Sequence, residues 1–207
     1  MKTIVFYMLT VLILLSSKIC AQDLSTSVAN LKKANTEKEY IAIRNGLERL
    51  CMQSPGEWLP NYYIAYADVQ LSFRTPSKEN KLKYLSDADT YLKKLTDISG
   101  TDASEVYTLK GYRLYSLIAL DPQTNGPKYF GEVTLNYQTA LKFNPDNPRA
   151  IMLLAMFNND MAKFMHRTYD DFEAQISKAT ELFARANSLP NYPSWGKEWL
   201  DSRLSAK

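Results

Sequence analysis

Few side chains in this sequence are of the types that carry out nucleophilic or metal-assisted catalysis. His166 is the only histidine in the 207 residues, and the two cysteines are Cys20 and Cys51. A Ser-His-Asp triad or a Cys-His dyad needs a nucleophile in a recognisable local motif, and the motif G-x-S-x-G is not present. A zinc site needs several Cys or His ligands, which this sequence does not supply. The sequence therefore predicts a protein that is not an enzyme, with no catalytic and no metal-binding residues.

The charged residues that could form a reactive cluster have a simpler interpretation as helix ends. His166 in FMHRTY lies at a predicted helix end, where a cation is favourable to the helix dipole. Asp170, Asp171 and Glu173 in YDDFEAQ could suggest a cation site, but they fall at the start of a predicted helix, where acidic residues are stabilising. No EF-hand loop, P-loop or G-x-G-x-x-G is present, so no cofactor is expected.

The first residues have the composition of an export signal. Lys2 is followed by an apolar run from Ile4 to Leu15, and residues 16–21 resemble a cleavage region. The run is too short to span a bilayer, which takes roughly 20 residues. We expect a signal peptide at 1–21 and a mature domain at 22–207, exported to the periplasm or the cell surface. An uncleaved N-terminal anchor and lipidation at Cys20 are the alternatives, and Ile19 before that cysteine disfavours the second.

Cleavage would leave a nearly neutral chain with one cysteine. Removing Lys2 and Lys18 reduces the 25 basic residues to 23, against 22 acidic residues. That balance gives no reason to expect nucleic acid or an anionic membrane as a partner, and no transmembrane segment remains. Cys51 lies in the apolar phrase LERLCM, which favours a buried thiol over an intermolecular disulfide.

One apolar phrase recurs along the chain at a constant interval. Val133, Tyr137 and Ala140 are spaced as one face of a helix, and Pro145 ends that helix. Equivalent triplets precede three other helix-breaking residues, and each of the four helix-breaking residues lies 45 residues after the one before it. This spacing indicates a repeat. The other breakers are Pro55, Gly100 and Pro190, and their triplets are Ile43, Leu47 and Leu50; Ala88, Leu92 and Leu95; and Ala179, Phe183 and Ala186.

The recurrence predicts an all-α domain whose elements can be placed approximately. Amphipathic patterns without glycine-rich or strand-like stretches favour long helices throughout. The expected helices cover 24–34 and 37–53, helix pairs cover 57–98, 102–144 and 147–188, and a terminal helix covers 192–204.

The phrase small-x3-aromatic-x2-small followed by proline resembles the second helix of the tetratricopeptide repeat. The resemblance implies a right-handed superhelical array of antiparallel helix pairs, an α-solenoid with a period of 45 residues in this sequence. The family's period is about 34, so each unit must carry about 11 further residues in longer helices or in loops, and we expect them at 74–81, 121–128 and 167–172. HEAT-type repeats, whose period is nearer that of this chain, rank second because they lack the phrase.

The resemblance also implies a function. Such arrays bind a peptide or protein partner in a concave groove lined by the first helix of each pair. We therefore expect a non-catalytic interaction scaffold of the cell envelope, without a cofactor. Two alternatives stay open: a small-ligand binder, of glycan type, that uses exposed aromatic rings, and a structural subunit of an envelope assembly.

Tyrosine and tryptophan are the most plausible groove residues, because each ring combines an apolar body with a polar tip. Packing between repeats would explain many of the same rings, and burial of Trp58, Tyr62 and Tyr66 would count against ligand stacking. The expected partner-binding residues are Trp58, Asn61, Tyr62, Tyr66, Arg113, Asn158 and Asn159.

Overall fold

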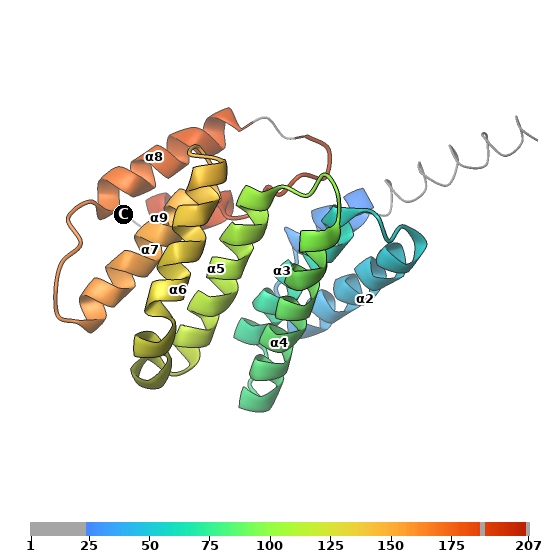
Figure 1. Cartoon of the computed structure of the whole chain (residues 1–207), viewed down its shortest axis with the longest axis horizontal. Coiled ribbons are helices and arrows are strands. Elements are labelled where there is room, and N and C mark those ends of the chain that lie inside the picture. Colours follow the sequence, from blue (N-terminus) through green and yellow to red (C-terminus); the bar gives the residue numbers. More distant parts are fainter. Residues whose placement is uncertain (1–23, 187–188, 206–207) are drawn as a thin grey trace, which may run out of the picture.

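The computed structural model describes residues 24–186 and 189–205, and the expected signal peptide lies outside this part of the chain. All regular elements in the described residues are helices, which confirms the all-α prediction (Figure 1). After a helical stretch at 24–31, they are α2 (Glu37–Gln53), α3 (Trp58–Arg74), α4 (Lys78–Lys94), the short 3-10 helix η1 (Leu95–Asp97), α5 (Ala103–Leu120), α6 (Pro122–Phe143), α7 (Pro148–Phe164), α8 (Phe172–Arg185) and α9 (Lys197–Ser205).

The helices from α2 to α8 pack in chain order, each against the next (Figure 1). In addition, α3 contacts α5 and α5 contacts α7, so these three helices form a continuous row. The other helices of the pairs, α4, α6 and α8, pack against this row. The helices α3, α5 and α7 therefore form one layer, and α4, α6 and α8 form a second layer packed against it.

The expected breakers lie between helices. Pro55, Gly100 and Pro145 occupy the connections that precede α3, α5 and α7, and Gly100 has φ +77°, which glycine adopts without strain. The three helices begin at Trp58, Ala103 and Pro148, so consecutive starts are 45 residues apart (58 to 103, 103 to 148).

Three expected boundaries were wrong. The connection expected at 74–81 covers only 75–77, because Ser77 caps α4, which begins at Lys78. Residues 121–128 do not form a loop, because Asp121 caps α6 by accepting from the Thr124 amide at 3.2 Å and Pro122 is compatible with the first helical position. The terminal helix begins at Lys197 instead of 192. Pro193 and Gly196, with φ +98°, keep the preceding residues out of a helix.

A side chain of α6 lies very close to the α5 backbone at Gly111. Tyr137 of α6 is fully buried together with Val133 and Ala140, as the spacing of these residues predicts. A Cβ atom added to Gly111 would lie 2.6 Å from Cε1 of the Tyr137 ring. Only glycine therefore lets this ring lie flat against the α5 backbone.

We expect Gly111→Ala to lower the free energy of unfolding by about 1–3 kcal/mol, because the added methyl group overpacks a buried contact. Gly131→Ala is the matched control, since it also lies inside a helix but has no atom within 4 Å of an added Cβ. That change should raise stability by about 0.5–1 kcal/mol through helix propensity. Equal effects of the two changes in urea unfolding would contradict the close contact.

A buried carboxylate connects the first helices. Asp68 on α3 is fully buried, and Nε of Arg44 on α2 donates to its Oδ1 at 2.5 Å. Arg44 also pairs with Glu48 at 2.8 Å and with Asp87 of α4 at 3.7 Å. Oδ2 of Asp68 has no hydrogen-bond partner among the described residues. Burial raises the pKa of Asp68 to about 7, although the hydrogen bond and charge of Arg44 act in the opposite direction.

This shift predicts a loss of stability as the pH rises. The folded state holds the Asp68 proton more tightly than the unfolded state, whose pKa is close to the usual 3.8. The free energy of unfolding should therefore fall between about pH 4 and about pH 7, because the carboxyl of the unfolded chain is ionised in this range while the buried one keeps its proton. Urea unfolding of the natural chain and of Asp68→Asn across this range measures the contribution. If the two chains have parallel pH profiles, Asp68 does not titrate in this window.

Candidate functional site

The aromatic face of α3 is covered by the end of the same chain. Residues 189–200, here called the C-terminal segment, run back over this face. Trp195 stacks on Tyr66 with ring centroids 4.8 Å apart, and its Nε1 donates to the hydroxyl of Tyr62 at 3.0 Å. The Tyr63 hydroxyl donates to the carbonyl of Asn191 at 3.0 Å. Tyr62 and Tyr66 are consequently buried and do not line a groove open to a partner.

Two other expected groove residues lie near this cluster. Trp58 is half-buried and meets Tyr62 edge-on at 5.6 Å and Tyr192 edge-on at 6.0 Å. Asn61 is buried and donates to the Glu57 carbonyl at 3.2 Å, so its side chain bonds back to the first turn of its own helix.

The remaining expected groove residues are elsewhere. Arg113 of α5 donates from Nε to the Leu85 carbonyl of α4 at 3.0 Å, on the side of α5 that faces another pair. Asn158 and Asn159 lie, partly exposed, in the second half of α7. The structure thus brings Trp58, Asn61, Tyr62 and Tyr66 together on α3 but separates the other three from them.

His166 has the helix-end position that its sequence context predicts. Its φ is +55°, its amide donates to the Lys163 carbonyl at 3.0 Å, and the Arg167 amide donates to the Ala162 carbonyl at 2.8 Å. This pair of bonds is a Schellman termination of α7. Cys51 is partly buried and packs against the core of α2 and its neighbours.

A buried ion pair joins two helices of the row, α5 and α7. Arg149, near the start of α7, donates from Nε to Oε2 of Glu105 on α5 at 2.9 Å and from Nη2 to Oε1 at 2.6 Å. Glu105 also accepts from Asn147 at 2.8 Å and from the Tyr62 hydroxyl at 3.2 Å. Both charged side chains are almost fully buried. A two-point contact of this kind is strong only because all the lone pairs of the carboxylate are satisfied.

Aromatic rings flank the guanidinium of Arg149. The rings of Phe183 and Trp195 each lie 5.9 Å from its central carbon. Burial acts to lower the pKa of Arg149, but the adjacent Glu105 carboxylate outweighs it, so the pKa lies above its usual value. The ion pair, with the contacts of Tyr62 and Trp195, holds α3, α5, α7 and the C-terminal segment together.

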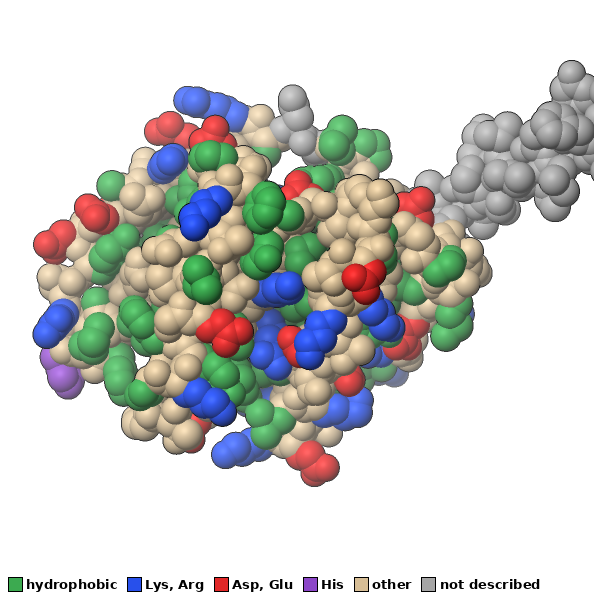
Figure 2. Space-filling view, in the orientation of Figure 1, with side chains coloured by type: hydrophobic (Ala, Val, Ile, Leu, Met, Phe, Trp, Pro, Cys, Tyr) green, Lys and Arg blue, Asp and Glu red, His purple; other side chains and the backbone are tan. Residues whose placement is uncertain are grey.

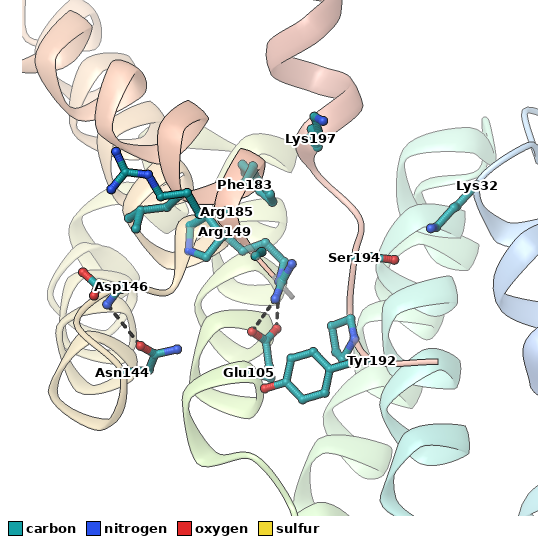
Figure 3. A pocket seen from close by; sticks show the side chains of 14 residues that line it. Lys32, Glu105, Asn144, Asp146, Arg149, Phe183, Arg185, Tyr192, Ser194 and Lys197 are labelled. Carbon is teal, nitrogen blue, oxygen red and sulfur yellow. Dashed lines mark hydrogen bonds and ion pairs between the residues drawn. The ribbon is translucent and has the colours of Figure 1, made fainter. Parts of the chain in front are cut away.

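A cavity of about 480 Å³ opens above this ion pair (Figure 3). Four cationic side chains line it against two carboxylates, so the lining carries an excess of positive charge. Lys32, Arg185 and Lys197 are exposed at the rim, while Arg149 is buried at the base. The rest of the wall is largely apolar. The complete lining is Lys32, Glu105, Asn144, Asp146, Pro148, Arg149, Leu182, Phe183, Arg185, Ala186, Tyr192, Pro193, Ser194 and Lys197.

Tyr192 presents a phenol at the edge of this cavity. Its hydroxyl donates to Oδ2 of Asp102, whose Oδ1 accepts from the Glu105 amide at 3.1 Å and so caps α5. Burial raises the pKa of Tyr192, and the hydrogen bond to Asp102 acts in the same direction. The free protein therefore holds a neutral phenol that donates its proton in a hydrogen bond to a carboxylate.

The other cavity of similar volume in the described residues lacks this excess of positive charge. On the face drawn in Figure 2, basic and acidic side chains are interspersed, and hydrophobic side chains do not form one broad patch. A second cavity of about 490 Å³ includes Glu48 and Asp97 against Lys94, so its lining opposes an anionic ligand. The cavity beside the Glu105–Arg149 pair is the stronger candidate site.

The sequence contained a signal for this pair that our expectations missed. Glu105 lies on the buried stripe of α5, four and seven residues before Leu109 and Tyr112, and Arg149 lies four residues before buried Leu153. Opposite charges on the apolar stripes of two neighbouring helices point to a buried pair. Lys32, Tyr192 and Lys197 give no such signal, because the return of the C-terminal segment creates their surroundings.

Comparison with protein-family models and with curated proteins finds no match to this chain. Among solved structures, the chain is similar to the "HusA haemophore from Porphyromonas gingivalis" with a TM-score of 0.78. The match covers 90% of this chain and 91% of that chain at 24% sequence identity. The similarity establishes a shared all-helical fold. Within residues 24–186 and 189–205, no helix is both long and apolar enough to cross a membrane.

We expect Trp195→Ala to lower the free energy of unfolding by about 3–5 kcal/mol, because Trp195 is buried against Tyr66 and Tyr112. Amide exchange in residues 191–200 should accelerate at the same time. Leu189→Ala, in the same segment but largely exposed, should change stability by no more than about 0.5 kcal/mol. Similar small losses for both variants would mean that the segment is not anchored by Trp195.

Proposed function

We propose that this protein is exported and binds haem in the cavity beside the Glu105–Arg149 pair. The observation that carries the proposal is an apolar cavity with a cationic rim, in a fold shared with a haemophore. Haem combines a flat apolar ring, two carboxylates on one edge and a central iron. Each of these parts can be compared with the cavity.

The ring matches the apolar part of the wall. The cavity volume lies within the range of small-molecule sites, about 300–1,000 Å³. Phe183 offers an aromatic face, and prolines on two different segments offer rigid apolar surfaces. The apolar lining residues are Pro148, Leu182, Phe183, Ala186 and Pro193.

The two carboxylates match the cations at the rim. Lys32, Arg185 and Lys197 come from three separate segments and surround the opening. Lys32 and Lys197 have no ion-pair partner among the described residues, while Arg185 lies 3.6 Å from the exposed Glu181. Charge-assisted hydrogen bonds from such side chains to carboxylates are about twice as strong as neutral ones. With Arg149 held by Glu105, these cations remain to bind the ligand.

The cavity has no histidine that could bind the iron. No histidine, cysteine or methionine lines the cavity. His166 lies past the far end of the 17-residue helix α7, whose first residues line the cavity, so the two are about 25 Å apart. In this proposal the affinity comes chiefly from the ring and the carboxylates.

The peptide-scaffold hypothesis is less favoured than small-ligand binding. The α3 face that would line a peptide groove carries the chain's own C-terminal segment, fixed by Trp195. The same burial disfavours a glycan-type ligand stacked on Tyr62 or Tyr66. A small ligand in the neighbouring cavity requires neither of these rings to be exposed.

We also propose that the helix pairs are copies of one unit of the tetratricopeptide-like type. The 45-residue interval between the starts of α3, α5 and α7 supports this interpretation. A right-handed superhelix would place this row on the concave side, where the C-terminal segment would fill the concavity.

Titration of the mature chain with ferric haem should change the haem absorption spectrum at one-to-one stoichiometry. Lys32→Gln and Lys197→Gln should each weaken binding by roughly threefold to tenfold, since each removes one partly solvated cation near a ligand carboxylate. Lys163→Gln on α7, outside the cavity, is the matched control and should leave the affinity unchanged.

The dimethyl ester of haem tests the role of the carboxylates, because both are then uncharged. The affinity of the protein for this ester should be the same in the natural chain, in Lys32→Gln and in Lys197→Gln. Absence of haem binding by the natural chain, or equal losses in all three lysine variants, would overturn the proposal. If the natural chain does not bind haem but binds a peptide, the scaffold hypothesis would be favoured again.

A further inference from the structure

We infer that the ligand site continues into a neighbouring cavity at Lys33, and that it suits porphyrins with carboxylates on more than one edge better than it suits haem. The inference rests on the proposed haem binding and specifies the number and the placement of the acidic groups on the preferred ligand.

A smaller cavity lies where the two ends of the described chain meet. Its volume is about 340 Å³, and residues within 25–33 and 189–194 line it. We call it the N-terminal cavity. Lys32, Tyr192 and Ser194 line both this cavity and the one beside the buried ion pair. The two cavities therefore adjoin at these three residues, and one ligand can extend from the first into the second.

The N-terminal cavity has the charge of an anion site. Among the described residues its lining includes Lys32 and Lys33 and no carboxylate. Both lysines are exposed in the turn after the helical stretch, where the Lys33 amide donates to the Asn30 carbonyl at 3.0 Å. Val28 and Leu189 add apolar surface beside these cations. A carboxylate on a short apolar arm matches such a lining, because it gains charge-assisted hydrogen bonds while its arm contacts apolar side chains.

The cations of the combined site lie on different sides of it. Arg185 and Lys197 line only the first cavity, and Lys33 lines only the N-terminal cavity. Lys32 lies where the two cavities adjoin. Figure 3 shows Arg185 and Lys32 on opposite sides of the buried ion pair. Acidic groups on one edge of a ligand can therefore reach only part of this set of cations.

The placement of the cations distinguishes between porphyrins. Haem has its two carboxylates on one edge of the ring, so it leaves the cations on the other side unpaired. Coproporphyrin has four carboxylates distributed around the ring, so it can place acidic groups in both cavities at once. Each additional charge-assisted contact raises affinity, and specificity is the resulting difference between the two ligands. The preferred ligand is therefore a porphyrin with carboxylates on more than one edge.

Ferric coproporphyrin and haem together test the inference. Both contain ferric iron in the same macrocycle, and two vinyl groups of haem are replaced by carboxyethyl groups in ferric coproporphyrin. The mature chain should bind ferric coproporphyrin tighter than haem by roughly tenfold or more, in titrations followed by absorption. The tetramethyl ester of ferric coproporphyrin should lose this advantage, because its four acidic groups are uncharged.

Lys33→Gln removes a cation that lines only the N-terminal cavity. It should weaken the binding of ferric coproporphyrin by roughly threefold to tenfold and change the haem affinity by less than about twofold. Lys38→Gln is the matched control, since Lys38 is exposed on α2 and lines neither cavity. This control should leave both affinities unchanged.

The outcomes separate the inference from the proposed function. If the natural chain binds haem but binds ferric coproporphyrin no more tightly, the additional carboxylates find no cations and the inference is wrong. Equal effects of Lys33→Gln and Lys38→Gln on ferric coproporphyrin would also overturn it, because the N-terminal cavity then takes no carboxylate. In both cases the proposed haem binding stands. If the natural chain binds neither compound, the proposed function fails, and this inference fails with it.

Discussion

The ion pair between Glu105 and Arg149 is the contact on which the rest of the structure depends. Removing two charges from water is costly, and only a two-point contact with every lone pair satisfied compensates for that cost. Here Asn147 and Tyr62 complete the contacts of the carboxylate, and Tyr62 in turn accepts from Trp195. One charged contact therefore specifies the relative positions of three helices and of a segment far along the chain. Apolar packing alone allows helices to shift slightly against each other, whereas the two-point contact between Arg149 and Glu105 allows no such shift without losing a hydrogen bond.

The C-terminal segment has two roles that cannot be separated. Through Trp195 it covers the aromatic face of α3, and through Tyr192, Pro193, Ser194 and Lys197 it supplies one wall of the cavity. The cavity is thus a consequence of how the chain closes on itself. Its opposite wall comes from α7 and α8, and Lys32 near the N-terminus completes the rim. Residues from both ends of the chain meet at a site that neither end could form alone.

Sequence reasoning located the helices better than the site. The 45-residue spacing of Pro55, Gly100 and Pro145 correctly placed the connections between helices, because a proline or an αL glycine ends a helix wherever it occurs. Residues 121–128 were mistaken for a loop because Gly126 and Pro127 outweighed the capping Asp121. Burial of Tyr62 and Tyr66 was not predictable from local pattern, since it depends on Trp195, more than a hundred residues later. The apolar stripes around Glu105 and Arg149 indicated that both are buried, but their partnership requires α5 and α7 to be adjacent, which no local pattern shows.

The separation between Tyr62 and Trp195 also has a consequence for how the molecule is made. The hydrogen bond between them spans 133 residues, and that from Tyr63 to Asn191 spans 128. A chain that is synthesised from its N-terminus can form the early helix pairs in order, through local contacts. It cannot bury the α3 rings until residues 191–195 have been synthesised. Until then the nascent protein carries an exposed aromatic surface and must be kept from aggregating.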